Sequence, residues 1–426
     1  MTPGAADPPL GTFLVTLRRS RLVDPADLDR LAARHDGSAR DLTDTLLRNG
    51  TLTHYQVDKL LNGRWQGLVL GPYSVLAPLG RGGMGTVVYL ARDRRQSEAL
   101  GDSELAALKL LPNRQAARDP KALARCLREM DLGRRVAHPN VVRTFAAGET
   151  DDVHYLAMEY VSGRTLRQVV IAGGPLAVGD AARVGADVAA GLAHIHARGM
   201  IHRDVNPGNI MVRSDGRGVL LDLGLAYAPG EPLPADPTIV GGRGYAVGTM
   251  DYLAPEQARD ASAVGPAADL YGLGCTLAFA LNGSVPFPAA TTKEKIQRHR
   301  DDPPPALAHV PPDFARIVHS LMAKEQHARP ATAAEARDLL LKWATAQAPR
   351  SLVDAVTLAD APGEDAGLWA AAPGEDIPLE EIPEEEVGVL EEIPEEVLEL
   401  PPEEPRRAGC AGAALLLVAV GVWAVL

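Results

Sequence analysis

The stretch that decides the fold is His202-Arg203-Asp204-Val205-Asn206-Pro207-Gly208-Asn209. It places an aspartate and an asparagine five residues apart in a loop that Pro and Gly interrupt. An aspartate can orient or deprotonate a hydroxyl group, and an asparagine can bind a hard cation through its amide oxygen. A second acidic turn, Asp222-Leu223-Gly224, follows eighteen residues after Asp204. Together they indicate a polar site that could hold a metal ion.

A glycine-rich segment lies upstream, Gly80-Arg81-Gly82-Gly83-Met84-Gly85-Thr86-Val87. Glycines let the backbone approach phosphate groups closely, and their amides can donate to phosphate oxygens. Dinucleotide-binding folds share this pattern but require a helix after it, whereas Thr86–Ala91 reads as a strand, as does Tyr73–Leu79 before the glycines. No Gly-Lys-Ser or Gly-Lys-Thr follows, which excludes a P-loop NTPase site here.

Lys109 lies within the apolar segment Ala106–Leu111, a third predicted strand. A buried lysine without an anionic partner would be costly. Glu129, in the predicted helix Lys121–Arg135, is the candidate partner. The alternative is a lysine at a strand end whose amine reaches solvent.

In this order, the motifs resemble those of the bacterial eukaryotic-like serine/threonine protein kinase family. The resemblance covers residues 73–344 and includes three later motifs, Ala254-Pro255-Glu256, Asp269-Leu270-Tyr271-Gly272-Leu273-Gly274 and Arg329-Pro330. It implies an α+β, bilobal fold with a small, mostly β N-lobe and a larger helical C-lobe. It also implies that Asp269 braces the catalytic loop and that Arg329 pairs with Glu256.

The resemblance implies transfer of the ATP γ-phosphoryl group to Ser or Thr hydroxyls of protein substrates, with Mg²⁺ or alternatively Mn²⁺. Asp204 would be the catalytic residue, Lys109 positioned by Glu129 would hold the α- and β-phosphates, and Asn209 and Asp222 would hold the metal. The hinge between the lobes would lie at Tyr155–Gly163. The residues implied for ATP binding are Leu79, Gly80, Arg81, Gly82, Gly83, Met84, Gly85, Thr86, Val87, Ala107, Lys109, Met158, Glu159 and Val161.

One position departs from the family pattern. Asn206 stands where the resemblance leads us to expect a lysine. A neutral amide supplies no cation to the transferred phosphoryl group, and loss of one such stabilising group costs on the order of 10²–10³ in rate. Two function classes therefore stay open: an active, slow kinase, or a nucleotide-binding pseudokinase that signals by conformation. A membrane-tethered adaptor is compatible with either.

Asp222 to Glu256 resembles an activation segment. It is rich in Gly and Pro, and Thr238 and Thr249 are its candidate phosphorylation sites. Arg203 beside Asp204 is a candidate partner for a phosphate on this segment. Thr249 is the weaker candidate, because the family resemblance also gives it a structural role next to Asp204. Clustering of copies, and hence self-association, would favour phosphorylation in trans.

The net charge of −12 comes from one region. Residues 351–405 contain eighteen Asp and Glu and no Lys or Arg, so the remainder carries −12 + 18 = +6. No basic stripe interleaved with aromatic residues occurs, which argues against a nucleic-acid partner. The three cysteines, Cys126, Cys275 and Cys410, are far apart and do not indicate a disulfide framework.

Residues 11–65 are predicted to form three or four short helices with a packing or docking role, after a disordered segment 1–10. Asp24-Pro25 indicates a helix start, and Thr53 with Gln56 has capping-box spacing. The first residues do not resemble a signal peptide.

The acidic, Pro-rich linker 345–407 is predicted to stay unfolded. It is interpreted as an extended spacer, or alternatively as a docking or autoinhibitory segment. Ala408–Leu426 is nineteen residues without a charge. As a helix it would be about 28 Å long, enough to cross a bilayer core. Arg406-Arg407 precedes it and predicts a cytoplasmic kinase domain.

Overall fold

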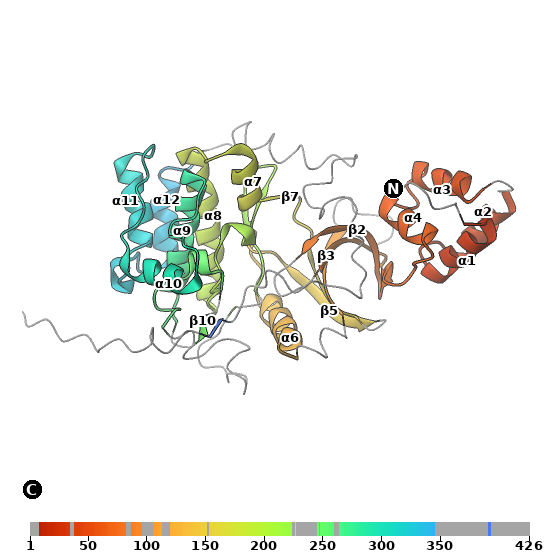
Figure 1. Ribbon diagram of the computed structural model, residues 1–426, viewed down its shortest axis with the longest axis horizontal. Coiled ribbons are helices and arrows are strands. Elements are labelled where there is room, and N and C mark those ends of the chain that lie inside the picture. The colour runs from red at the N-terminus through yellow and green to blue at the C-terminus, as the bar shows by residue number, and fades with distance from the viewer. Residues whose placement is uncertain are drawn as a thin grey trace, which may run out of the picture.

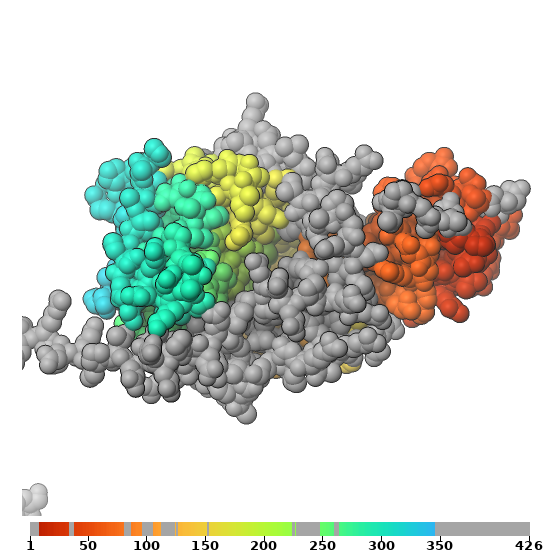
Figure 2. Space-filling view, viewed as in Figure 1, coloured from red at the N-terminus to blue at the C-terminus, as the bar shows by residue number. Residues whose placement is uncertain are grey.

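A group of short N-terminal helices, a mostly β lobe and a larger helical lobe follow one another along the longest axis of the protein (Figure 1). In the space-filling view the N-terminal helices lie at the end opposite the helical lobe (Figure 2). The structure is a computed structural model. It describes residues 8–34, 38–81, 87–95, 105–112, 120–150, 153–223, 226, 245–246, 248–259, 264–345 and 391–392. The two lobes confirm the predicted bilobal fold.

The described part of the N-terminal region contains four short helices, where the sequence predicts three or four. They are α1 (Leu10–Ser20), α2 (Pro25–Arg34), α3 (Ala39–Arg48) and α4 (His54–Leu61). Two of them begin with a complete capping box, formed by Ser38 with Asp41 and by Thr53 with Gln56. Leucines recurring at helical spacing, with Phe13, fill a separate small core between the helices. The capping prediction at Thr53 is therefore confirmed.

The N-lobe is built on a six-stranded antiparallel sheet in the order β1-β2-β3-β4-β6-β5. Its strands are β1 (Val69–Leu70), β2 (Tyr73–Arg81), β3 (Val87–Asp93), β4 (Leu105–Pro112), β5 (Thr144–Thr150) and β6 (Val153–Glu159). Helix α6 (Pro120–Arg134) connects β4 to the β5–β6 pair. The three strands that the sequence predicts correspond to β2, β3 and β4. Strand β6 stops at Glu159, and the chain then enters β7 (Gly163–Thr165) in a second sheet.

The C-lobe consists mainly of helices: α7 (Leu166–Gly173), α8 (Val178–His196), α9 (Ala267–Asn282), α10 (Thr292–Asp301), α11 (Pro312–Leu321) and α12 (Ala333–Leu341). A small sheet joins β7 to β8 (Ile210–Arg213) and β9 (Gly218–Leu220). Three 3₁₀ turns, η3 (Pro207–Asn209), η4 (Met250–Tyr252) and η5 (Gln326–Ala328), lie in the connections. A further pair, β10 (Tyr245–Ala246) and β11 (Glu391–Glu392), is antiparallel.

Helix α9 is the centre of the C-lobe core, and every residue from Ala268 to Leu281 is buried. The helix passes directly against the catalytic loop. A Cβ atom on Gly272 would lie 2.8 Å from the backbone oxygen of Val205, a distance that side chains do not tolerate. Glycine at this position therefore allows the close approach of α9 to the loop.

A buried ion pair in the C-lobe joins Arg329 to Glu256. The guanidinium of Arg329 donates from Nη1 and Nη2 to the two carboxylate oxygens of Glu256, at 2.6 and 2.9 Å. The Arg329 side chain is fully buried, and that of Glu256 is 11% exposed. The remaining donors of Arg329 bind three backbone oxygens, those of Ala267, Ala323 and Lys324. The predicted pairing of these two residues is confirmed.

Among the residues just described, none of the helices is both long and apolar enough to span a bilayer. The predicted membrane segment, Ala408–Leu426, lies outside the described residues. Of the predicted linker 345–407, only Thr345 and the two residues of β11 are described.

We expect Arg329→Met to lower the free energy of unfolding by about 3–5 kcal/mol, because it leaves the Glu256 carboxylate buried without its partner. Urea denaturation followed by circular dichroism would measure the change. Arg316→Met is the matched control, since Arg316 pairs with Asp313 where both side chains are about 70% exposed, and it should change stability by less than about 0.5 kcal/mol. Equal losses in the two variants would contradict the structural role of Arg329.

Candidate active site

Asp269 of helix α9 holds the backbone of the catalytic loop, residues 202–209. The buried Asp269 carboxylate accepts the backbone N–H of His202 at 2.9 Å and that of Arg203 at 2.7 Å. Nε2 of His196 lies 2.7 Å from the same carboxylate. Burial alone would raise the pKa of Asp269, but the hydrogen bonds from His196 and His202 hold the pKa below its usual value. Asp269 therefore remains an anion and anchors two successive backbone amides.

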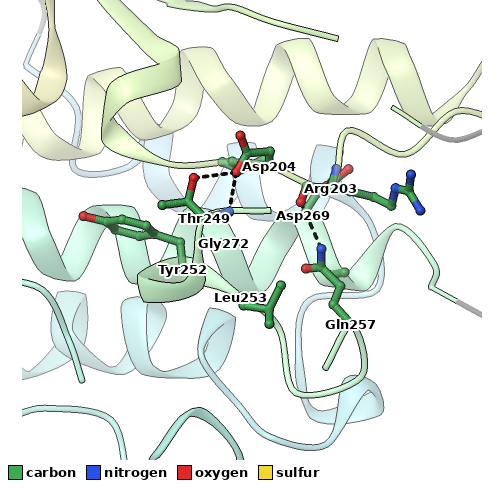
Figure 3. A pocket seen from close by; sticks show the side chains of 10 residues that line it. Arg203, Asp204, Thr249, Tyr252, Leu253, Gln257, Asp269 and Gly272 are labelled. Carbon is green, nitrogen blue, oxygen red and sulfur yellow. Dashed lines mark hydrogen bonds between the residues drawn. The ribbon is translucent and has the colours of Figure 1, made fainter. Parts of the chain in front are cut away.

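The backbone at Arg203 is in the left-handed region, with φ at 65°. This conformation is costly for a residue with a side chain, and it persists where surrounding contacts compel it. Nε2 of Gln257 donates to the Arg203 carbonyl at 2.9 Å. Gly248 lies so close that a Cβ on it would be 2.9 Å from the same carbonyl. Figure 3 shows the Arg203 guanidinium extending away from the Asp204 carboxylate.

The Asp204 carboxylate is oriented by two neighbours. Its Oδ1 accepts both the backbone N–H of Thr249, at 2.9 Å, and the Thr249 hydroxyl, at 2.8 Å (Figure 3). Its Oδ2 accepts Nδ2 of Asn209 at 2.7 Å. Since the amide nitrogen of Asn209 faces Asp204, its oxygen is the atom that a hard cation would bind. The contact brings the activation segment and the catalytic loop together around one carboxylate.

Asn206 has a structural task in the loop. Its Oδ1 accepts the backbone N–H groups of Gly208, at 2.8 Å, and Asn209, at 3.2 Å, and so caps η3. Its Nδ2 donates to the Thr249 hydroxyl at 3.1 Å and to the Asp204 carbonyl at 3.2 Å. The side chain is buried and bonded at both ends. Asn206 therefore holds the catalytic loop in its conformation. The sequence analysis considered only the lysine expected at this position and did not predict that role.

Lys109 joins the two lobes. Its Nζ donates to Glu129 on α6 at 2.8 Å and to Asp222 at 3.0 Å. Lys109 and Glu129 are buried, whereas the Asp222 side chain is 28% exposed. Burial alone would lower the pKa of Lys109, but the charges of Asp222 and Glu129 raise it above its usual value. The lysine is thus a fixed cation, and the alternative of an amine reaching solvent is excluded.

Asp222 is placed by the strand before it. Nε2 of His202 lies 2.9 Å from the carbonyl of Leu221, and the Leu221 N–H donates to the carbonyl of Asn209 at 2.8 Å. Asp222 itself is in the left-handed region, with φ at 52°. The two expected metal ligands, Asn209 and Asp222, are therefore tied to one another through Leu221. Among the described residues no three His, Cys, Asp or Glu side chains gather as a metal cluster.

The structure distributes the expected ATP-binding residues that it describes over four strands, with Val161 just after the last of them. Leu79, Gly80 and Arg81 end β2, and Val87 begins β3. Ala107 of β4 pairs with Met158 of β6, and Glu159 pairs with Ala106. Val161 packs in a small buried cluster that Met158 borders. Gly82, Gly83, Met84, Gly85 and Thr86 lie outside the described residues.

Sequence reasoning missed several residues of this site. His196 and Gln257 hold the loop through Asp269 and Arg203, and neither belongs to a motif that the sequence analysis used. Met211 shares the buried cluster of Val161, and its only signal was an apolar residue in a strand. Of the candidate phosphorylation sites, Thr238 lies outside the described residues. The hydroxyl of Thr249 is bonded to Asp204 in this conformation.

Comparison with known proteins agrees with this geometry. The protein kinase domain family matches residues 73–340, from the start of β2 into α12. The chain is 37% identical over 288 residues to the serine/threonine-protein kinase PknB of Mycobacterium leprae. The aligned residues cover 65% of this chain and 44% of that protein. It is 36% identical over 264 residues to the probable serine/threonine-protein kinase PkwA of Thermomonospora curvata, covering 62% and 33%.

A third relative is the serine/threonine-protein kinase PrkC of Bacillus subtilis, 32% identical over 256 residues that cover 60% of this chain and 37% of that protein. The chain thus spans less than half the length of each of these relatives. The family match extends across both lobes and includes Lys109, Glu129, Asp204, Asn209 and Asp222. On this match and on the site geometry, the chain belongs to the protein kinase family.

Proposed function

We propose that this protein is an ATP-dependent protein serine/threonine kinase. The observation that carries the proposal is the buried cation Lys109, bonded to both Glu129 and Asp222. A buried lysine held by two carboxylates is a preformed site for phosphate oxygens, and the Asp222 contact can be exchanged for a metal ion. The choice of serine and threonine as acceptors is supported by the names of the relatives above.

The residues of this chain take the following roles in the proposal. Asp204 orients the acceptor hydroxyl and takes its proton. Each carboxylate oxygen can accept two hydrogen bonds, so Oδ2, which accepts Asn209 among the described residues, has capacity for a substrate hydroxyl. Asn209 and Asp222 would hold Mg²⁺, or Mn²⁺ in its place, which neutralises charge on the phosphates when bound. Little covalent work falls to the protein, because positioning and charge stabilisation dominate phosphoryl transfer.

Asn206 is the reason to keep a second candidate, a nucleotide-binding pseudokinase. The amide supplies no cation, and its bonds to Thr249, Gly208 and Asn209 occupy both ends of the group. The same bonds support activity, however, because they hold Asp204 and Asn209 in place. We therefore favour an active kinase whose rate is reduced by the missing charge.

We expect transfer of labelled phosphate from Mg·ATP to a generic basic protein by the wild-type chain, and its loss by more than about 10²-fold in Asp204→Asn, which removes the acceptor for the hydroxyl proton. Asn206→Lys should not exceed the wild-type rate, because lysine has no acceptor and so cannot cap η3 through the amides of Gly208 and Asn209, which offsets the charge it adds. A radiolabel transfer assay measures all three. Nucleotide binding without transfer by the wild-type chain, with transfer gained in Asn206→Lys, would instead establish the pseudokinase.

We further propose that Ala408–Leu426 inserts into a membrane and tethers the kinase domain on the cytoplasmic side. The support is the charge-free length of the segment and Arg406-Arg407 before it. On this basis the linker 345–407 is an acidic spacer, and copies gathered in the membrane could phosphorylate one another, with Thr238 as a candidate acceptor. The other proposed partners of this chain are its protein substrates.

We expect the full chain to stay in the membrane pellet after alkaline carbonate extraction, and the double variant Leu416→Asp, Val420→Asp to move to the soluble fraction. Two carboxylates near the centre of the segment would cost several kcal/mol in a bilayer. Val15→Asp is the control, because Val15 is an exposed apolar residue of α1. Wild-type protein in the soluble fraction would contradict the tether.

A further inference from the structure

The outer edge of strand β2 is covered by the N-terminal helices. Strand β1 pairs with β2 only at Tyr73 and Ser74. Beyond that point the Val75 N–H donates to the carbonyl of Leu68 at 2.9 Å, and the Val75 carbonyl accepts Nε2 of Gln56 at 2.8 Å. The next carbonyl, that of Leu76, accepts the Thr53 hydroxyl at 2.6 Å. These backbone groups would otherwise form an open sheet edge.

The contact falls where β2 is irregular. The register of β2 against β3 shifts between Val75 and Ala77, so Leu76 lies in a bulge. Bulges re-aim the strand that follows them. Here the two carbonyls at the bulge are held by Gln56 of α4 and by its N-cap residue Thr53. From this point β2 runs to a second register shift, between Pro78 and Gly80, where Leu79 lies.

The two residues that hold the bulge are also the capping box of α4. The Thr53 N–H donates to Oε1 of Gln56 at 2.9 Å, and the Gln56 N–H donates to the Thr53 hydroxyl at 3.2 Å. Gln56 is only 2% exposed. The same two side chains therefore begin the helix and bind the sheet, so the helix cannot shift without breaking the bonds at the bulge.

A second contact reaches the neighbouring strand. The rings of Tyr55 on α4 and Tyr89 on β3 lie 6.1 Å apart. The N-terminal helices thus hold both β2 and β3, and these strands carry Leu79 and Val87, two of the residues expected to contact the nucleotide.

We propose that the N-terminal helical domain is a positioning element of the nucleotide site. Thr53 and Gln56 are positioning residues: they bind the β2 bulge and thereby set where Leu79 and Val87 stand, so docking of the domain determines the affinity for ATP. This inference rests on the proposed kinase function. It assigns a task in nucleotide binding to a region outside the kinase domain proper.

Titration calorimetry with Mg·ATP on the full chain tests the inference. Thr53→Ala and Gln56→Glu each remove a hydrogen bond to a β2 carbonyl and should raise the Kd by about three- to tenfold. Ser38→Ala is the matched control, because Ser38 is the N-cap of α3 and its side chain bonds to Asp41 in the first turn of that helix. It should leave the Kd unchanged. Thr53→Ser keeps the hydroxyl and should restore wild-type affinity.

Steady-state kinetics separate positioning from general damage. The KM for ATP should rise in Thr53→Ala with kcat nearly unchanged, and amide hydrogen exchange at residues 75–81 should become faster. Tyr55→Phe, which keeps the ring against β3, provides a milder variant should Thr53→Ala fail to fold, and it should raise the Kd by less than threefold.

The outcomes are distinct. Equal Kd values for wild type, Thr53→Ala and Gln56→Glu would overturn the inference and leave the kinase proposal intact. An equal rise in Ser38→Ala and Thr53→Ala would also overturn it, because the effect would then follow from a weakened domain. A wild-type chain that does not bind Mg·ATP would contradict the proposed function, and the inference with it.

Discussion

A buried carboxylate on helix α9 holds the catalytic loop in a backbone conformation that the loop would not keep by itself. Asp269 accepts two successive amides, those of His202 and Arg203, while Arg203 has a left-handed φ of 65°. Such strain costs about 1–3 kcal/mol, and hydrogen bonds to a charged acceptor contribute about 1.5–3 kcal/mol each. The anchor therefore offsets the strain. Gly272 allows helix α9, which carries Asp269, to lie directly against the loop, because no Cβ atom intervenes there.

Two charged groups of the site are assembled from distant parts of the chain. Asp204 is shared between the catalytic loop and Thr249 of the activation segment. Lys109 is shared between α6 of the N-lobe and Asp222 of the C-lobe. Asp204 is half-buried, whereas Lys109 is buried, and the two carboxylates beside Lys109 make its burial tolerable. The positions of the charges thus follow from how the lobes and segments pack together.

The motifs predicted the residues of the site better than they predicted what those residues do. Lys109 and Glu129 were expected to pair, and the structure pairs them. The bond from Lys109 to Asp222, which was expected only as a metal ligand, was not predicted. The sequence analysis treated Asn206 only as the loss of a cation at this position. In the structure its amide caps η3 and bonds to Thr249. That difference arises because a residue type limits the available hydrogen bonds, whereas the fold decides which of them form. His196 and Gln257 were missed for the same reason, since a polar side chain that bonds to a distant segment has no local signature.

The sequence by itself determined the order of elements, the bilobal architecture, the capping box at Thr53 and Gln56, and the Arg329–Glu256 pair. Those features depend on local spacing or on motifs whose order is informative. Only the tertiary structure decided that the same capping box binds the β2 bulge, that Asn206 organises the loop, and that His196 supports Asp269. The contacts of Gln56 and Thr53 with β2, of Asn206 with Thr249 and of His196 with Asp269 join segments that are separated in the chain. Their existence depends on the packing of whole elements, which no local pattern of residues encodes.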